Sequence, residues 1–239
     1  LMQHKYKVLH LYWQSIILKQ IMQRESEFFK YNIVYPILVP MLDYTCNSYY
    51  NMNILNNINN IIYLDIKNLK YKVKKEAKEY KEEYEKAISK SSEYYVKYQY
   101  ELYIDYKVTY NRNNIISIPI ESYVFTGGAH GMTYLNSYNY NLINGKKLEL
   151  SDIFKENIDY KKIVNEYIYY VISQNPDIYF KGDDGFKGIK ENQSFYIDND
   201  GIVVYFSLYE IAPYYVGIPK FKMKFSKFSK YFKNTIRNK

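Results

Sequence analysis

The clearest pattern along the chain is an alternation of apolar and polar residues over 94–110. Every even position from Tyr94 to Tyr110 is apolar or aromatic, and most odd positions are polar or charged. This period of two predicts a β-strand that packs on one face and meets water on the other, which is typical of an antiparallel sheet. A strand of this length is expected to bend or bulge. The polar turn at 111–114 predicts a return strand over 115–125.

A second pattern predicts a long helix over 47–90. Apolar and aromatic residues recur at steps of three and four from Ile54 to Ile88, and they form one continuous face. The second half of the segment interleaves Lys and Glu at helical spacing, which indicates a solvated outer face rather than a surface for a partner. Shorter patterns predict strands over 28–38, 132–142, 195–198, 202–208 and 218–225, a helix over 160–173, and a last helix that begins at Ser226.

Together these elements predict an α+β fold with antiparallel or mixed sheets, one long helix in the N-terminal half, and shorter helices packed on one face. The length of 239 residues fits one large domain or two small ones. We expect residues 1–27 to be an N-terminal extension with no assigned role. Residues 28–120 are expected to form a first α+β domain, and residues 121–239 a second one that ends in a basic helix.

Composition limits the chemistry that the chain can perform. The single Cys, Cys46, can form neither an internal disulfide nor a Cys-based zinc site. The three His (His4, His10 and His130) are too few and too scattered for a His-built metal centre. We therefore expect no metal and no cofactor. Many of the 33 Tyr side chains are expected to be half-buried, because each has an apolar ring and a polar tip.

The positive charge lies at the C-terminal end. The chain has 33 Lys and Arg against 25 Asp and Glu, a net charge of +8, and the segment 220–239 holds eight of these bases and no acid. Such a tail could bind an anionic polymer, lipid headgroups or nucleic acid. The same segment carries a regular apolar stripe, which favours a solvated face on a last strand and helix. Nucleic acid is therefore not the expected partner.

No segment predicts a transmembrane span. The longest apolar stretch, Val8–Leu18, is too short and is interrupted by polar residues. It also lacks the small-residue cleavage site of a signal peptide, so the pattern leaves a cytoplasmic location open. The oligomeric state is not indicated by any feature of the sequence.

The most distinctive candidate site is the glycine-rich segment 126–131. Gly127, Gly128 and Gly131 permit a tight turn, and the segment lacks the spacing of a phosphate-binding loop. His130 could act as a general base in a small hydrolase, with Glu210 or Asp152 as its orienting acid. A turn whose His lines a binding surface is the favoured interpretation, because no nucleophile motif accompanies it.

Two acidic segments could be mistaken for catalytic or calcium sites. Residues 182–185 and 198–201 cluster Asp with Gly. A metal-dependent deacetylase would also need two His on one helical face, and the chain has no such pair. Neither segment matches a calcium-binding loop, and both are expected to be turns.

Three blocks in order resemble a known pair of domains. They are the glycine-rich segment 124–131, the pattern N-x-x-x-G-K-x-L-x-L-x-D-x-F that ends at Phe154, and the segment Phe206–Gly217 with its YEIAPYY core. The pair resembles the bacterial domains of unknown function in the extracytoplasmic region of the anti-sigma factor RsiV and in front of the catalytic domain of the peptidoglycan deacetylase PdaC. About 28–120 resembles the first domain, and 121–235 the second.

The resemblance implies a non-catalytic recognition or sensor domain at the cell envelope, which binds lysozyme or a cell-wall glycan. The chain has no recognisable sigma-binding segment, so signalling by proteolysis is not expected. Lysozymes are often basic, and a chain of charge +8 would repel them unless its acids cluster on the docking face. The expected binding residues are Gly127, Gly128, His130, Gly131, Tyr209, Glu210, Pro213, Tyr214 and Tyr215.

Overall fold

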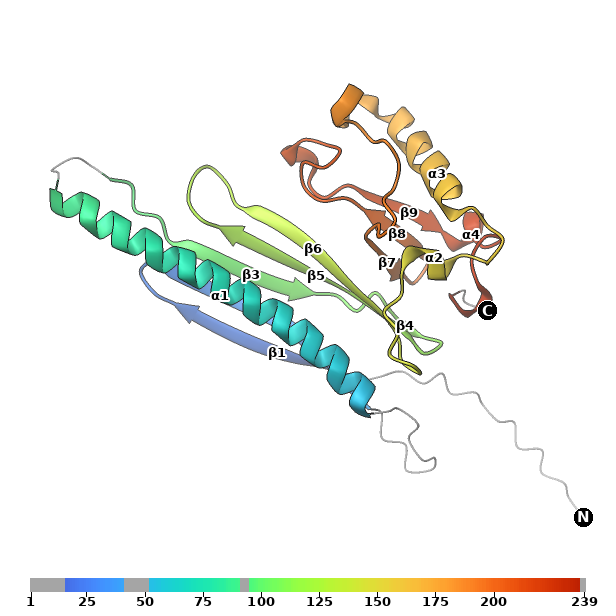
Figure 1. Cartoon of the computed structure of the whole chain (residues 1–239), viewed down its shortest axis with the longest axis horizontal. Coiled ribbons are helices and arrows are strands. Elements are labelled where there is room, and N and C mark those ends of the chain that lie inside the picture. The colour runs from blue at the N-terminus through green and yellow to red at the C-terminus, as the bar shows by residue number, and fades with distance from the viewer. Residues whose placement is uncertain (1–15, 41–51, 91–94, 237–239) are drawn as a thin grey trace, which may run out of the picture.

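The structure is a computed structural model that describes residues 16–40, 52–90 and 95–236. An elongated part, in which the long helix α1 lies along a large sheet, joins a smaller part that holds a second sheet and the short helices (Figure 1). This is the α+β architecture that the sequence predicts. No helix within the described ranges is long and apolar enough to cross a membrane. Cys46 lies outside these ranges.

The large sheet has six strands in the order β1-β2-β3-β5-β4, with β6 on the other edge of β5. All neighbours are antiparallel except β2 and β3, so the sheet is mixed. A parallel pair needs a long crossover connection, and α1 (Met52–Lys90) lies within it. The strands are β1 (Ile16–Glu25), β2 (Phe29–Val39), β3 (Tyr100–Tyr106), β4 (Tyr110–Arg112), β5 (Ile115–Phe125) and β6 (Met132–Asn141).

The expected N-terminal extension, residues 1–27, is partly a structural strand. Its residues 16–25 form β1, which pairs with β2 over the whole length of β1. The pattern did not reveal this strand because both of its faces mix apolar and polar residues, as at Leu18 and Ile21, which are 47% and 57% exposed. An edge strand with solvent on one side needs no clean alternation.

The predicted strand over 94–110 is divided in two. β3 ends at Tyr106, and residues 107–109 separate it from β4. The amides of Lys107 and Thr109 donate to the Pro119 and Ser117 carbonyls of β5, so this connection stays close to the sheet. The expected bend is therefore present. The sheet around β3 is mixed, because β3 lies between parallel β2 and antiparallel β5, which agrees with the expected antiparallel or mixed sheets.

The helix α1 packs its predicted apolar face on the large sheet. The residues that it buries fall at steps of three, four and seven, and they are Leu55, Ile58, Ile62, Ile66, Val73 and Ala77. Its second half places Lys and Glu four residues apart in exposed ion pairs, such as Lys75–Glu79 at 3.7 Å. The solvated outer face is thus confirmed. The helix covers β2 and β3 but leaves part of β6 uncovered.

The second sheet is small and antiparallel, in the order β7 (Phe195–Asp198), β8 (Gly201–Tyr205) and β9 (Lys220–Lys224). The helix α3 (Tyr160–Gln174) packs against it through Val164 and Ile168, and the Tyr167 hydroxyl donates to the Lys222 carbonyl of β9. The remaining helices are α2 (Leu150–Ile153), α4 (Phe225–Phe228) and the 3-10 turns η1 (Pro176–Ile178), η2 (Gly182–Asp184), η3 (Tyr214–Val216) and η4 (Asn234–Ile236).

The expected C-terminal helix is largely absent from the described residues. Only the single turn α4 forms, after which the chain leaves the helical path. The amide of Lys155 donates to the Tyr231 carbonyl, and that of Lys233 donates to the Ile153 carbonyl, so this segment bonds to the end of α2 and the residues after it as well as forming short local turns. Burial of the Phe232 ring against Phe154, with centroids 5.0 Å apart, accounts for the departure.

The two sheets meet along β5. Successive residues of a strand point to opposite faces, so Ile116 packs under α1 while Ile115 joins the second core. On the second face the Ser117 hydroxyl donates to the Asn139 amide oxygen and accepts from the Ile197 amide of β7. The division expected between 120 and 121 therefore falls inside a strand that serves both cores.

Candidate functional site

The glycine turn between β5 and β6 is fixed by backbone geometry. The backbone φ angles of Gly127 and Gly128 are +96° and +87°. Residues other than glycine rarely adopt such positive φ angles. A Cβ on Gly131 would lie 2.5 Å from the Tyr123 ring and 2.6 Å from the Val124 carbonyl oxygen, so only glycine fits there. The turn thus presents the exposed His130 at its end.

His130 meets the distant segment 207–217. Its ring stacks on that of Tyr214, with centroids 4.0 Å apart and an angle of 21° between the planes. The Tyr214 hydroxyl donates to the Gly131 carbonyl at 2.9 Å, and the His130 Nδ1 lies 3.1 Å from the same oxygen. Since a carbonyl only accepts, Nδ1 carries the proton in this contact. The structure therefore brings together two of the sequence-predicted segments.

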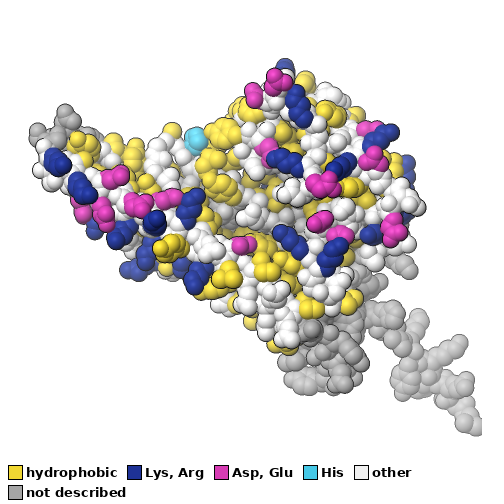
Figure 2. Space-filling model, in the orientation of Figure 1, with side chains coloured by type: hydrophobic (Ala, Val, Ile, Leu, Met, Phe, Trp, Pro, Cys, Tyr) yellow, Lys and Arg dark blue, Asp and Glu magenta, His cyan; other side chains and the backbone are white. Residues whose placement is uncertain are grey.

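Aromatic side chains extend this contact into an exposed patch. The Tyr209 ring lies 5.8 Å from Tyr214 and is 46% exposed, and Tyr215 is 73% exposed. Figure 2 shows hydrophobic side chains gathered where this loop meets the β5–β6 turn. We call His130, Tyr209, Pro213, Tyr214 and Tyr215 the aromatic loop surface.

Glu210 supports this loop rather than His130. Its carboxylate accepts from the Ser207 amide at 2.8 Å and pairs with the Lys190 ammonium at 2.6 Å. These bonds hold the turn in which Tyr209 adopts a φ of +64°, a conformation that costs energy for a non-glycine residue. The Glu210 side chain is thus a structural part of the predicted site.

Asp152, the other acid considered for His130, is also engaged elsewhere. It accepts from the Lys146 ammonium at 2.6 Å and from the Glu149 amide at 3.0 Å, at the start of α2. Burial alone raises the pKa of Asp152, but these two hydrogen bonds and the positive charges of Lys146 and Lys233 outweigh it and hold the pKa below its usual range. Its role is to cap α2.

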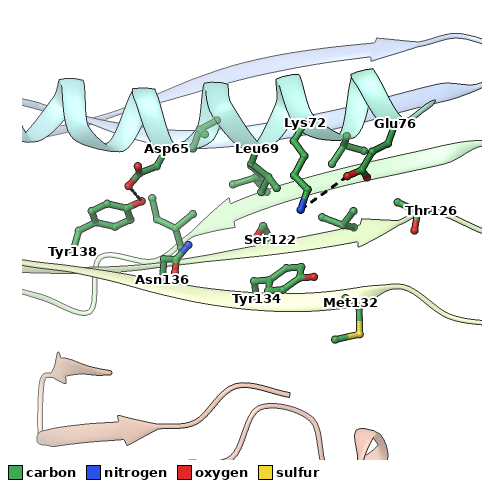
Figure 3. Close-up of a pocket in the computed structure, with 15 residues that line it drawn as sticks. Asp65, Leu69, Lys72, Glu76, Ser122, Thr126, Met132, Tyr134, Asn136 and Tyr138 are labelled. Carbon is green, nitrogen blue, oxygen red and sulfur yellow. Dashed lines mark hydrogen bonds and ion pairs between the residues drawn. The ribbon is translucent and has the colours of Figure 1, made fainter. Parts of the chain in front are cut away.

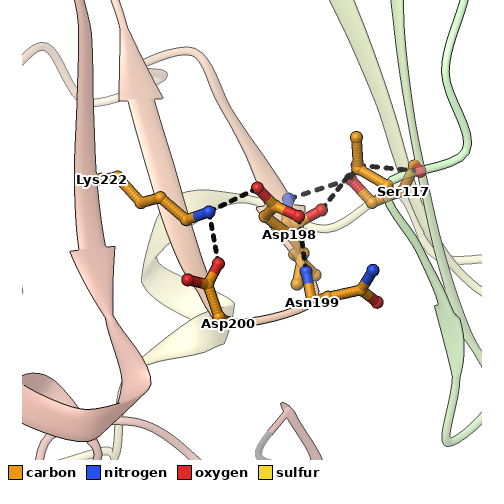
Figure 4. Close-up of polar contacts among 7 residues, drawn as sticks. Ser117, Asp198, Asn199, Asp200 and Lys222 are labelled. Carbon is orange, nitrogen blue, oxygen red and sulfur yellow. Dashed lines mark hydrogen bonds and ion pairs between the residues drawn. The ribbon is translucent and has the colours of Figure 1, made fainter.

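The acidic segments form turns, as the sequence predicts. Residues 198–201 close the β7–β8 hairpin, and Lys222 of β9 forms ion pairs with both Asp198 and Asp200 (Figure 4). The Lys222 hydrogen bonds raise the pKa of Lys222 and lower that of Asp200. Residues 182–184 form η2. Within the described ranges, no three His, Cys, Asp or Glu side chains cluster as metal ligands would.

The basic segment contributes to the core. Phe221, Met223 and Phe232 are almost completely buried. The rings of Phe221 and Phe232 are therefore not available as stacking platforms for a nucleic acid in the folded chain. The apolar stripe of the sequence is thus a core stripe, as the spacing indicates.

Sequence reasoning did not find a groove between α1 and β6. It has a volume of about 500 Å³ and is bounded by one side of α1 and by the uncovered residues of β5 and β6 (Figure 3). A second hollow of about 610 Å³ continues from it, because both are lined by Asp65, Asn136 and Tyr138. One sequence feature could have indicated this groove. It is Asn136, a polar residue at one of the alternating apolar positions of the predicted strand over 132–142.

A hydrogen bond marks the middle of this groove. The Tyr138 hydroxyl donates to the Asp65 carboxylate at 2.9 Å. Burial, together with this bond to a carboxylate, raises the pKa of Tyr138 far above its ordinary value. Tyr138 therefore stays protonated and ties α1 to β6.

Two family models match consecutive parts of the chain, in the order of the two domains expected from the sequence. A family model described as deacetylase PdaC matches residues 22–133, and one described as a protein of unknown function, DUF3298, matches residues 151–226. The chain is therefore similar to a PdaC domain over its first part and to a DUF3298 domain over its second. This pairing confirms the resemblance seen in the three sequence blocks. The PdaC match ends just inside β6, within the six-stranded sheet.

One curated relative is similar over about half of the chain. It is the peptidoglycan-N-acetylmuramic acid deacetylase PdaC of Bacillus subtilis, which is 36% identical over an alignment of 123 residues that covers 49% of this chain. The similar segment is 26% of the relative, so this chain matches about a quarter of that protein.

Two solved structures share the fold over nearly the whole chain. A DUF3298 family member from Bacteroides fragilis has a TM-score of 0.65 and 22% identity, and covers 93% of this chain and 96% of its own. A DUF3298 family protein from Pseudomonas aeruginosa has a TM-score of 0.58 and 16% identity, with coverages of 95% and 97%. At these identities the likeness concerns the fold.

Proposed function

We propose that this chain is a non-catalytic recognition domain of the bacterial cell envelope, and that it binds a protein partner through the aromatic loop surface. The PdaC and DUF3298 domains support the location, since the similar relative is named for a peptidoglycan substrate. The observation that carries the proposal is the contact between the glycine turn and segment 207–217. This contact holds exposed aromatic rings in fixed positions.

The chemistry of this surface suits binding. Tyrosine supplies a large, rigid contact area at low entropic cost, and it is enriched among the residues that dominate interfaces. Tyr215 is 73% exposed, so its ring is available to a partner. The stack on His130 orients Tyr214, and the hydroxyl bond to Gly131 fixes it further.

The surroundings of His130 favour binding over hydrolysis. A general base needs an orienting acid and a nucleophile within hydrogen-bond reach. In the described part of the chain the Nδ1 of His130 bonds to a backbone carbonyl, while Glu210 and Asp152 are held by lysines. A small hydrolase centred on His130 is therefore the less favoured alternative.

A lysozyme is the first partner to test, in line with the resemblance to the RsiV domains. We would titrate the chain with lysozyme by calorimetry, using Tyr215→Ala and a matched control, Tyr71→Ala on α1, which removes a ring that is 69% exposed. Loss of a central interface tyrosine is expected to weaken binding roughly tenfold or more, and the control should bind like the wild type.

Two results would count against this proposal. If lysozyme does not bind the wild type at all, the partner class is wrong. If Tyr215→Ala and Tyr71→Ala bind equally well, the aromatic loop surface is not the interface.

A further inference from the structure

From the groove between α1 and β6 we infer a second binding site, which takes a neutral acetamido-sugar chain such as the glycan strand of the cell wall. The inference rests on the proposed function only in placing the chain at the envelope. The groove comprises the hollow lined by α1, β5 and β6 and its continuation past Asp65, Asn136 and Tyr138 towards β7.

The first argument is an unsatisfied hydroxyl. Four described polar residues are buried, and three of them, Ser117, Asn139 and Gln193, use their side chains in hydrogen bonds. The fourth, Ser122, is 4% exposed and lines the groove, and its hydroxyl has no hydrogen-bond partner among the described residues. Buried polar groups are nearly always paired, so this one points to a ligand.

The second argument is the aromatic floor. Tyr134 and Ser122 are paired across β5 and β6 and lie on the same face of the sheet, below α1 (Figure 3). The Tyr134 ring is 47% exposed in the groove. A pyranose ring has an apolar C–H face and a polar rim, so it packs on an aromatic face while its hydroxyl groups bond to neighbours.

The third argument is the supply of neutral hydrogen-bonding groups. Asn68, Asn136 and Asn192 line the groove or its continuation, and their exposed side chains make no hydrogen bond to the described chain. A primary amide both donates and accepts, as do the hydroxyl and acetamido groups of such a sugar. The three amides lie along the route that the two hollows share.

The charges of the first hollow are paired within the protein. Lys72 pairs with Glu76 at 4.0 Å, and Asp65 accepts from Tyr138. An ionic ligand would have to compete with these contacts, whereas a neutral chain leaves them intact. The continuation adds one residue of each charge, Lys147 and Glu149, and so favours neither an acidic nor a basic ligand. The mixed apolar and amide lining therefore fits an oligosaccharide rather than an acidic or basic peptide.

The test uses the N-acetylglucosamine tetrasaccharide, with its fully de-acetylated form as the control ligand, in calorimetric titration of the full chain. Tyr134→Ala should weaken binding roughly tenfold or more, while Tyr170→Ala, which removes a 62% exposed ring on α3, should leave it unchanged. Ser122→Ala should also weaken binding without lowering thermal stability, since it removes a hydroxyl that bonds to no described residue.

The outcomes are separable from those of the lysozyme experiment. Loss of sugar binding in Tyr134→Ala with intact binding in Tyr215→Ala supports a separate glycan groove. The inference is overturned if the wild type does not bind the tetrasaccharide at millimolar concentration, if Tyr134→Ala binds it as the wild type does, or if an acidic or basic peptide binds the groove instead.

Discussion

At the scale of single residues, the buried polar contacts between the sheets matter most for stability. The hydroxyl of Ser117 serves both Asn139 and the Ile197 amide, in a place that excludes water. We expect Ser117→Ala to lower the free energy of unfolding by about 1–3 kcal/mol, because it leaves buried groups unpaired. Urea denaturation measures this, and a stability equal to that of Ser122→Ala would contradict it.

Gly131 is a second residue with a direct consequence. In Gly131→Ala the new Cβ would meet the Val124 carbonyl oxygen, so the turn must move, at a cost of about 1–3 kcal/mol. The stack of His130 on Tyr214 should loosen, which the NMR shifts of the His130 ring protons report. Gly128→Ala is the control, since its Cβ would meet open space and only the strain of its φ remains. Unchanged ring shifts in Gly131→Ala would show that the turn does not hold the stack.

Asp152 makes stability depend on pH. Its folded pKa lies below its ordinary value, so its contribution is fully present above the unfolded pKa of about 3.9 and is lost as the pH falls through the folded pKa. Asp152→Asn should flatten this part of the stability curve, measured by denaturation from pH 6 to about 2. Parallel curves for the wild type and Asp152→Asn would refute this assignment.

At the scale of elements, the two faces of α1 contribute very different amounts to the free energy of unfolding. One face is buried and apolar, and the other is exposed and charged. Ile62→Ala removes a completely buried side chain and should cost about 2–5 kcal/mol. Glu79→Ala breaks an exposed pair with Lys75 and should cost less than about 0.5 kcal/mol. Thermal unfolding of both variants measures the contrast. Similar losses in the two would mean that the charged face contributes more than exposed ion pairs normally do.

The sequence patterns predicted some of these elements and missed others. Clear periodicity predicted α1, β5, β6, α3 and the β7–β8 hairpin, because one face of each packs on a core. The pattern did not predict β1, because this edge strand has no regular alternation of apolar and polar residues. It also predicted a longer C-terminal helix than α4, because burial of Phe232 in the core takes the chain out of the helical path. The aromatic loop surface was predicted from two segments, but the groove was not, because it exists only where α1 leaves β6 uncovered.

At the scale of the whole molecule, the shared strand β5 couples the two cores. Ile115 belongs to one core and Ile116 to the other, so neither can lose its packing while β5 stays in place. We expect one cooperative unfolding transition, with coincident midpoints by far-UV and near-UV circular dichroism. Two separate transitions, with hydrogen-exchange protection of β5 retained after the first, would show that the cores unfold independently.

The parallel pairing of β2 with β3 has a consequence for how fast the chain reaches its native state. The β1–β2 and β5–β6 hairpins join neighbours in sequence and can close early, whereas β2 cannot meet β3 until the 39 residues of α1 have been synthesised and laid across. Pairings between distant segments slow folding, because closing the loop between them reduces the conformational entropy of the chain before any favourable contact has formed. During synthesis, the first hairpin therefore waits with the β2 edge unpaired until β3 has been made, and an unpaired strand edge is a site for aggregation.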